Sequence, residues 1–256
     1  MTQAALATEQ AAPAGTTANF RIYGARTADE RLKIAQRCQE MRDELHARWN
    51  GDARQIAWTP PCEIVLHHRH CDYLAAVGAG GRGTVGATYI QFDTRRPERI
   101  LRRRVDLLAV GQSDPLSALP HEMTHVLLAD RYAGTQPPLW LDEGVATMAD
   151  SLAKQKRHLL DLRASVTSGR RQSIAHMLSH EGPIPNQQRA CFYGQSVALA
   201  TILTRMDAPH RIFDFAAEAE RSSPEKALRK IYKLEMYELD RRISDLTLAS
   251  DLAQQP

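Results

Sequence analysis

The sequence predicts an α+β fold in which a small mixed sheet with an N-terminal helix comes first and a mainly helical part follows. Three stretches in the first half alternate or are rich in β-branched residues, and each is bounded by Gly, Pro or Asp. From about Ser113 onward, apolar residues recur at helical spacing instead. No internal repeat interrupts this order, so we expect strands and helices to be segregated along the chain.

The chain is expected to become ordered near residue 20, because residues 1–19 are rich in Ala, Gln, Thr and Pro and predict a disordered tail. Phe20–Tyr23 alternates as a short strand does. A helix follows at once: Thr27 and Glu30 form a capping-box pair, and Asn50–Gly51 ends the apolar repeat. The apolar stripe of this helix must cover a sheet.

Further strands are expected within an N-terminal α+β lobe that spans residues 20–112. They are Glu63–His67, Thr84–Phe92 and Ile100–Leu108. Either of the last two could be an edge strand that pairs with an extended peptide, and the sequence leaves that choice open.

Residues 113–256 are expected to form a helical lobe. Its segments with helical periodicity are Leu116–Arg131, Trp140–Ala153, Tyr193–Met206, Pro209–Glu220, Pro224–Tyr232 and Met236–Leu248. We expect the two lobes to form one domain with a cleft between them.

The composition excludes several classes of protein. Hydrophobic residues make up 43% and charged residues 25% of the chain, which is ordinary for a globular protein and unlike a disordered or collagen-like one. The longest stretch without Asp, Glu, Lys or Arg, 190–204, is shorter than the roughly 18 apolar residues of a membrane span, so none is expected. The net charge of +3 gives no reason to expect nucleic acid as a partner.

Two other groups of residues are less informative. Arginines gather between Arg95 and Arg104, which is typical of a solvated strand face, with phosphate binding as the minor alternative. No Cys-x-x-Cys occurs, and the cysteines leave room for one disulfide among Cys38, Cys62, Cys71 and Cys191. The first residues lack the basic and apolar regions of a signal peptide, so the compartment stays open, as does the oligomeric state.

The segment most specific for a function is His121-Glu122-Met123-Thr124-His125, inside an apolar helical run. This H-E-x-x-H pattern is expected about 0.02 times by chance in a chain of this composition. Histidines four positions apart project from one face of a helix, so both imidazoles can reach the same metal ion. The glutamate between them is then placed to act on water as a general base without ligating the metal.

A catalytic zinc site usually needs a third protein ligand, and Glu143 is the candidate. It follows His125 by 18 positions, beyond the helix-breaking Pro137–Pro138 and within a second helix. Gly144 is expected to let the two helices approach closely. Asp142, Thr147 and Asp150 are candidates for contacts that support the histidines, and the sequence does not rank them.

With these residues in view, the chain resembles the gluzincin metallopeptidases, specifically the exported peptidase MA-like domains. Leu119-Pro120-His121-Glu122-Met123-Thr124-His125 and Asp142-Glu143-Gly144-Val145-Ala146 carry the likeness, which extends from Phe20 to about Arg241. The resemblance implies a zincin-like fold with one Zn²⁺ per chain, held by His121, His125 and Glu143, with Glu122 as the general base. It also implies an exported protein.

A second likeness concerns Phe192-Tyr193-Gly194-Gln195-Ser196, which resembles the Pro-Tyr-Glu-Lys-Gly segment of the related aminopeptidase N family. In that family the tyrosine donates a hydrogen bond to the tetrahedral intermediate, a role that Tyr193 would hold here. The alternative is an ordinary buried tyrosine at a helix start. Those aminopeptidases also carry Gly-x-Met-Glu-Asn, where the glutamate holds the substrate amine. Gly86-Ala87-Thr88-Tyr89-Ile90 has no acidic residue, which favours an endopeptidase.

Other candidate clusters are weaker. His176 and His180 repeat the i, i+4 spacing, but no glutamate follows the first, and Gly182 soon ends the segment, so they are read as surface or capping residues. His67 and His68 would point to opposite faces of a strand, which leaves no complete metal site. Cys191 lacks an activating neighbour and is expected to be a core residue.

The sequence therefore predicts a zinc metallopeptidase that hydrolyses peptide or protein substrates. The competing hypothesis is an inactive peptidase-like domain that keeps zinc and serves as a peptide-binding or scaffold module.

Overall fold

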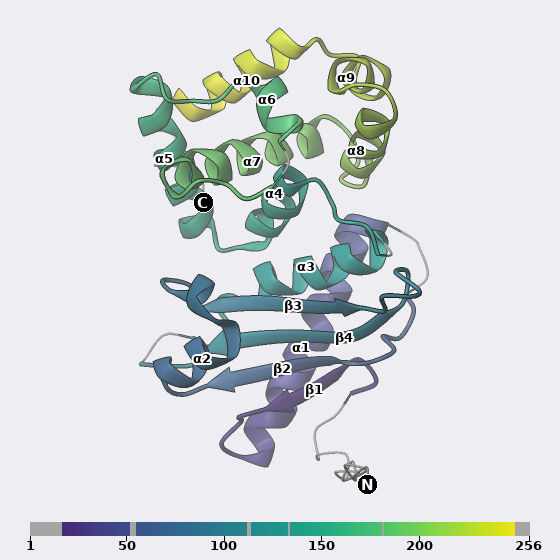
Figure 1. Ribbon diagram of the computed structural model, residues 1–256, viewed down its shortest axis with the longest axis vertical. Helices are drawn as coiled ribbons and strands as arrows, with labels where there is room; N and C mark the ends of the chain where they lie inside the picture. Colours follow the sequence, from purple (N-terminus) through teal and green to yellow (C-terminus); the bar gives the residue numbers. More distant parts are fainter. Residues whose placement is uncertain (1–16, 52–54, 112–113, 133, 181, 249–256) are drawn as a thin grey trace, which may run out of the picture.

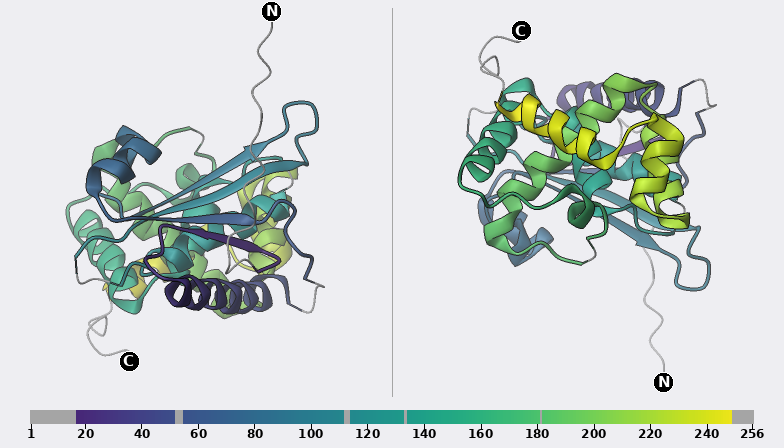
Figure 2. Two further views of the ribbon diagram at one scale, coloured as in Figure 1. Left: turned by 90° about the horizontal axis from the view of Figure 1, so that it is seen from below. Right: turned by 90° about the horizontal axis from the view of Figure 1, so that it is seen from above.

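The computed structural model describes residues 17–51, 55–111, 114–132, 134–180 and 182–248. It confirms the α+β class: a four-stranded mixed sheet is followed by a helical C-terminal part (Figure 1). The sheet lies at one end of the molecule and the last helices at the other (Figure 1). The sheet is therefore in front when the molecule is seen from below, and the last helices are in front when it is seen from above (Figure 2). Among the described residues, no helix is long and apolar enough to span a membrane.

The sheet consists of β1 (Phe20–Tyr23), β2 (Cys62–His67), β3 (Gly86–Phe92) and β4 (Ile100–Leu108). Their spatial order is β1-β2-β4-β3, with β1 and β4 parallel to β2 and with β3 antiparallel to β4. Strand β4 is therefore internal, and the hypothesis that it forms an edge is wrong. Strand β3 is the edge strand on the side of the helical part (Figure 1).

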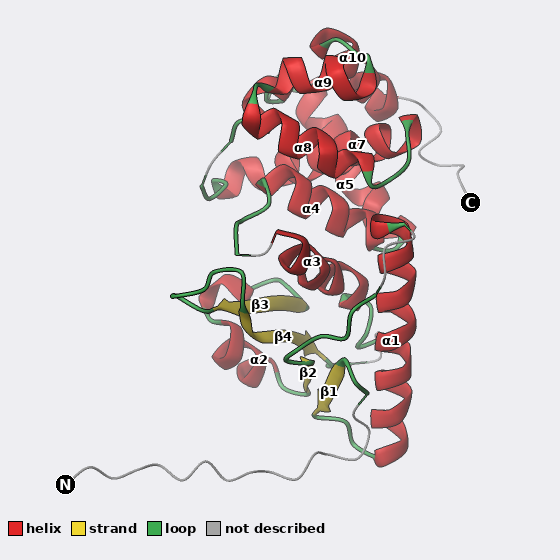
Figure 3. Cartoon of the chain, turned by 90° about the vertical axis from the view of Figure 1, so that its right-hand side faces the viewer, coloured by secondary structure: helices red, strands yellow, loops and turns green. Residues whose placement is uncertain are grey.

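Helix α1 (Ala28–Asn50) runs along one side of the sheet and reaches the helical part (Figure 3). Thr27 caps it by accepting a hydrogen bond from the Glu30 backbone N–H at 3.0 Å, as predicted. The Glu30 carboxylate bonds to the Arg26 N–H, one residue before the cap. Gly51 ends the helix with φ 57°, a conformation that glycine adopts easily.

The predicted disordered tail, residues 1–19, extends too far toward the first strand. Asn19 is buried, and its side-chain oxygen accepts a hydrogen bond from the Trp58 backbone N–H at 2.8 Å. Its amide nitrogen donates to Gln39 of α1. The described part of the chain is therefore structured at residue 19, while residues 1–16 of the predicted tail lie outside the described residues.

On the opposite face of the sheet, α2 (His70–Val77) and a 3₁₀ turn (Ala79–Gly81) precede β3. The helical part comprises α3 (Leu119–Tyr132), α4 (Leu139–Ala149), α5 (Leu152–Thr167), α6 (Ile174–Leu178), α7 (Asn186–Met206), α8 (Arg211–Arg221), α9 (Pro224–Tyr232) and α10 (Met236–Leu248). The predicted helix to Ala153 instead ends before Asp150, whose backbone is extended. Helix α5 has no counterpart among the predicted helices, and α7 begins at Asn186, before the predicted start at Tyr193.

Helix α3 lies between the sheet and the remaining helices (Figures 1 and 3). One hydrophobic core runs through both parts, from Phe20 in β1 to Ile243 in α10. At the end of α1, the Trp49 ring contacts the Phe213 ring of α8, with centroids 6.0 Å apart. The packing therefore fixes α3 against β3 on one side and against α4 on the other.

All four cysteines are free, so the disulfide for which the sequence leaves room is not formed. Cys38 of α1 and Cys62 of β2 are buried in the core, whereas Cys71 is exposed.

Candidate metal centre

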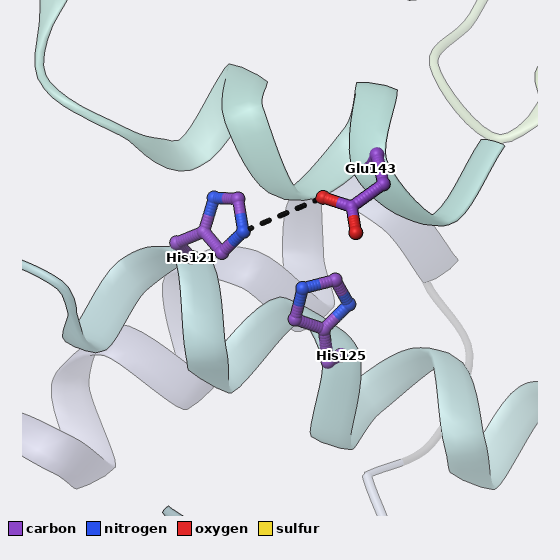
Figure 4. A group of neighbouring side chains, drawn as sticks. All are labelled: His121, His125 and Glu143. Atoms are coloured by element: carbon purple, nitrogen blue, oxygen red, sulfur yellow. Dashed lines mark ion pairs between the residues drawn. The ribbon is translucent and has the colours of Figure 1, made fainter. Parts of the chain in front are cut away.

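Two helices bring the predicted metal ligands together. His121 and His125 lie one turn apart on α3, with ring centroids 4.9 Å apart. Glu143 projects from α4 toward both rings, as Figure 4 shows. Its Oε2 atom lies 3.8 Å from His121 Nε2, and one ligand atom from each of the three residues lies within 4.8 Å of the others. These three residues could hold a metal ion.

The two helices present these side chains because their other faces are buried. On α3, Leu119, Met123 and Val126 are core residues, which turns the histidine face toward α4. Helix α4 starts directly after Pro138. A Cβ at Gly144 would lie 2.6 Å from the Ser196 carbonyl oxygen of α7, so this glycine permits close packing of α4 on α7. The expectation that it brings α4 close to α3 is therefore wrong.

A carboxylate holds each histidine by its Nδ1 atom. Asp150 Oδ2 lies 2.9 Å from Nδ1 of His121, and Asp142 Oδ1 lies 2.7 Å from Nδ1 of His125. An ionised carboxylate only accepts hydrogen bonds, so each Nδ1 donates. In the neutral imidazole, which is the form that binds a metal, Nε2 then carries the lone pair. Asp150 also accepts a hydrogen bond from Lys154 at 2.8 Å.

The structure thus ranks the three residues that the sequence left unranked. Asp142 and Asp150 orient the imidazoles. Thr147 is buried, and its hydroxyl has no hydrogen-bond partner among the described residues.

The electrostatics of this place favour a cation. Burial lowers the pKa of His125, but the negative charges of Asp142, Glu143 and Glu122 outweigh it and raise the value to about 10. Burial raises the pKa of Glu143, against the effect of both histidines. Burial likewise raises the pKa of Asp150, but hydrogen bonds from His121 and Lys154 outweigh it and lower the value. Acidic groups therefore surround the imidazoles, and a bound metal ion would compensate them.

Glu122 lies beside the possible ligands without being one of them. It is 8% exposed and lines a cavity of about 440 Å³ together with His125 and Glu143. Thr88 of β3 donates a hydrogen bond to its Oε2 atom at 2.8 Å. The cavity lies between β3, α3 and the start of α4, so it occupies the region where a cleft between the two lobes is predicted.

Tyr193 reaches the same place from α7. Its hydroxyl donates a hydrogen bond to Glu143 Oε1 at 3.4 Å, although 50 residues separate the two in the chain. Burial and the neighbouring charge of Glu143 raise the pKa of the Tyr193 phenol to about 12, so it keeps its proton at neutral pH. It lies inside α7 and not at the start of the helix, contrary to expectation.

The weaker clusters remain separate from this centre. His67 bonds to Asp106 at 2.5 Å, and His68 Nε2 lies 2.7 Å from the Gly24 carbonyl oxygen. Cys191 is buried. Within the arginine cluster, Arg102 pairs with Glu63, Arg103 with Asp130 and Arg104 with Asp106. These pairs neutralise three of the six arginines between Arg95 and Arg104.

Sequence reasoning missed Thr88 as a residue of the site. The sequence predicts a strand here that could pair with a peptide, and it shows that Gly86–Ile90 has no acidic residue, but neither feature points to Thr88. The signal that could have found Thr88 is its place on an expected strand next to the helix that carries Glu122, but this contact depends on which strand forms the edge. Comparison with family models and with curated proteins found no match to the chain.

Proposed function

We propose that this protein is a zinc-dependent metallopeptidase that favours internal peptide bonds. The observation that carries the proposal is the convergence of His121, His125 and Glu143 beside a buried glutamate, Glu122, that is not a ligand. A site that served only to hold a metal has no need of this fourth group, and a buried carboxylate is costly unless it is used or paired. The likeness to gluzincin peptidases agrees with the proposal.

The donor set supports zinc. Two imidazole nitrogens and one carboxylate oxygen are a ligand set of catalytic zinc sites, in which a fourth position is left for water or substrate. Calcium and magnesium would instead favour oxygen ligands throughout. The hydrogen bonds from both Nδ1 atoms to Asp142 and Asp150 prepare the Nε2 atoms as ligands.

When bound, zinc supplies a Lewis acid that polarises the scissile carbonyl and acidifies water. Glu122 accepts the proton of the attacking water and passes it to the nitrogen of the leaving amine. Its position one residue after His121 and its place in the wall of the cavity support this role. Burial keeps this proton transfer away from bulk water.

Tyr193 supplies a hydrogen-bond donor beside Glu143. Its hydroxyl, which bonds to Glu143 in this structure, can donate to the carbonyl oxygen of the substrate as negative charge develops there. The raised pKa of this phenol suits it to donate, since the group stays protonated at neutral pH.

A peptide substrate fits the edge of the sheet. Strand β3 has β4 on one side, and its other edge borders the cavity that Thr88, Ile90 and Phe92 help to line. An extended peptide can form main-chain hydrogen bonds with such an edge. The segment Gly86–Ile90 has no carboxylate that could hold a free amine, which favours an endopeptidase.

The proposal is tested with an internally quenched peptide library and protein reconstituted with one equivalent of zinc. We expect cleavage within the peptides and a loss of roughly 1,000-fold in rate for Glu122→Gln at unchanged zinc content. The matched control is Glu63→Gln, which changes a carboxylate on the outer face of the sheet and leaves the rate unchanged. Full activity of Glu122→Gln would contradict the mechanism. Binding of peptides without cleavage by zinc-loaded wild type would favour the inactive peptide-binding module.

A further inference from the structure

The side chain of Glu122 is enclosed by residues of the edge strand. We propose that Thr88 is a positioning residue for Glu122, and that it holds the carboxylate in the one orientation from which it acts on the substrate. The inference rests on the proposed role of Glu122 as general base. It adds a residue of β3 that is neither a possible metal ligand nor a proton carrier.

The contact is a pair of hydrogen-bond distances from one hydroxyl. Thr88 Oγ1 lies 2.8 Å from Oε2 of Glu122 and 3.0 Å from the backbone oxygen of the same residue. Both of these atoms are acceptors when the carboxylate is ionised, so Thr88 donates. The hydroxyl has one proton, which the two acceptors share, with Oε2 the nearer of the two. This shared donor holds the end of the Glu122 side chain near the Glu122 backbone and so restricts the side chain to few rotamers.

No second donor competes for this carboxylate within the described part of the chain: the hydrogen bond from Thr88 is the only one to the Glu122 side chain there. Because Glu122 is only 8% exposed, water can do little to replace the hydrogen bond from Thr88 if that bond is lost. The orientation of the carboxylate therefore depends strongly on this one hydroxyl.

Gly86, two residues earlier on β3, limits the side chain from another direction. A Cβ atom built there would lie 2.7 Å from Oε1 and 2.8 Å from Cγ of Glu122, and 2.9 Å from the Cβ of Ala118. Any larger residue would have to displace the glutamate or separate β3 from α3. The glycine thus provides the space that Glu122 occupies, and Thr88 fixes how it is occupied.

This arrangement matters for proton transfer because a general base must lie within hydrogen-bond reach of the proton that it takes. Glutamate has several rotatable bonds, and a carboxylate that moves by about 1 Å loses much of its effect. A purely structural role of Thr88, in which it only joins β3 to α3, predicts a loss of stability and no specific loss of turnover.

The first part of the test needs no activity. A double-mutant cycle with Thr88→Val and Glu122→Met measures the unfolding temperature of protein stripped of metal with a chelator. We expect Thr88→Val to lower this temperature by about 4 °C in the wild-type background. The shift should be less than half as large when residue 122 has no carboxylate and only its backbone oxygen can accept. Equal shifts in both backgrounds would overturn the proposed contact.

The second part separates positioning from folding. On zinc-loaded protein and a peptide that the wild type cleaves, Thr88→Val should lower kcat about tenfold, with KM and zinc content unchanged. Thr88→Ser, which keeps the hydroxyl, should restore most of kcat. The control Thr84→Val removes the hydroxyl that bonds to Tyr73 just before the strand, and it should leave kcat unchanged.

The outcomes distinguish this inference from the proposed function. An unchanged kcat in Thr88→Val, or an equal loss in Thr88→Ser, would overturn the positioning role even if the peptidase activity is real. Coupling between residues 88 and 122 in a protein that cleaves no peptide would instead refute the general-base role while leaving the contact intact.

Discussion

Two pairs of histidines with the same spacing have different surroundings. His121 and His125 lie within α3, with ring centroids 4.9 Å apart, and face Glu143. His176 and His180 have ring centroids 6.1 Å apart, and the second histidine lies beyond the end of the short helix α6. Within the described part of the chain, the second pair belongs to no group of three possible ligands.

The difference lies in the elements that surround each pair. Helix α4 offers the first pair Glu143 as a possible ligand and Asp142 as the partner of one Nδ1 atom, and Asp150, directly after this helix, holds the other Nδ1 atom. The second pair packs against an aromatic ring instead: His180 lies 5.9 Å from the Phe192 ring, and its Nε2 has no hydrogen-bond partner among the described residues. Spacing thus places two imidazoles on one face, and a neighbouring element must complete the site.

The largest effect is expected from removing the third ligand. Glu143→Ala should weaken zinc binding by at least about 1,000-fold, because two histidines alone bind the ion poorly and the fourth position is open. Competition with a chromophoric chelator measures this affinity. His176→Ala is the matched change in the second pair and should leave the affinity as it is. Equal losses in both variants would remove the distinction between the pairs.

Adjacent residues of α7 provide the next comparison, since Phe192 contacts His180 and Tyr193 contacts Glu143. Tyr193→Phe should lower kcat by roughly 100-fold, because it removes a donor to the developing charge while keeping the ring. Zinc content, measured alongside peptide cleavage, should not change. A variant with wild-type kcat would show that Tyr193 is an ordinary buried tyrosine.

Removing the charge of a carboxylate that holds an imidazole should have a smaller effect on zinc affinity than removing a ligand. Asp142→Asn and Asp150→Asn each keep the size of the side chain but lose its charge, and we expect zinc affinity to fall by about 10- to 100-fold. The same chelator competition measures it. Asp43→Asn, on the exposed face of α1, serves as a control for the loss of one negative charge. Unchanged affinity in both variants would contradict the orienting role.

The smallest effect concerns a histidine–aspartate contact outside the centre, between His67 and Asp106. Burial raises the pKa of Asp106, but hydrogen bonds from Arg104 and His67 outweigh it and lower the value. A lowered folded-state pKa means that the ionised group stabilises the fold at neutral pH and loses this contribution as pH falls below about 4. Asp106→Asn should therefore cost about 2 kcal/mol at pH 7 and much less at pH 3.

Urea unfolding of the two proteins at both pH values measures this difference, and zinc affinity should be unchanged in the variant. A cost that is the same at pH 3 and pH 7 would show that Asp106 acts through its shape and not through its charge.

Much of this architecture could be predicted from local patterns. The strand Ile100–Leu108 and the helices Pro224–Tyr232 and Met236–Leu248 have the predicted bounds. The relation between His121 and His125 follows from helical geometry alone, so it needs no knowledge of the rest of the fold. These features depend on residues close together in the chain.

The predictions that were wrong or incomplete concern helices with mostly polar faces, or contacts between residues far apart in the sequence. Helix α5 has Leu162 as its one buried residue among those described, so its periodicity is weak. The first turn of α7 is polar and exposed, which hid the true start of that helix. The contacts of Gly144 with α7 and of Thr88 with Glu122 exist only after the elements pack. A local pattern cannot reveal them.

The most direct test of the central claim is the metal content of protein purified without a metal-binding tag, measured by mass spectrometry for wild type, His125→Ala and His180→Ala. The account predicts about one zinc per chain in wild type and in His180→Ala, and a loss of zinc in His125→Ala. A folded wild type without zinc, or a His125→Ala variant that retains it in full, would contradict the claim that α3 and α4 form a zinc centre.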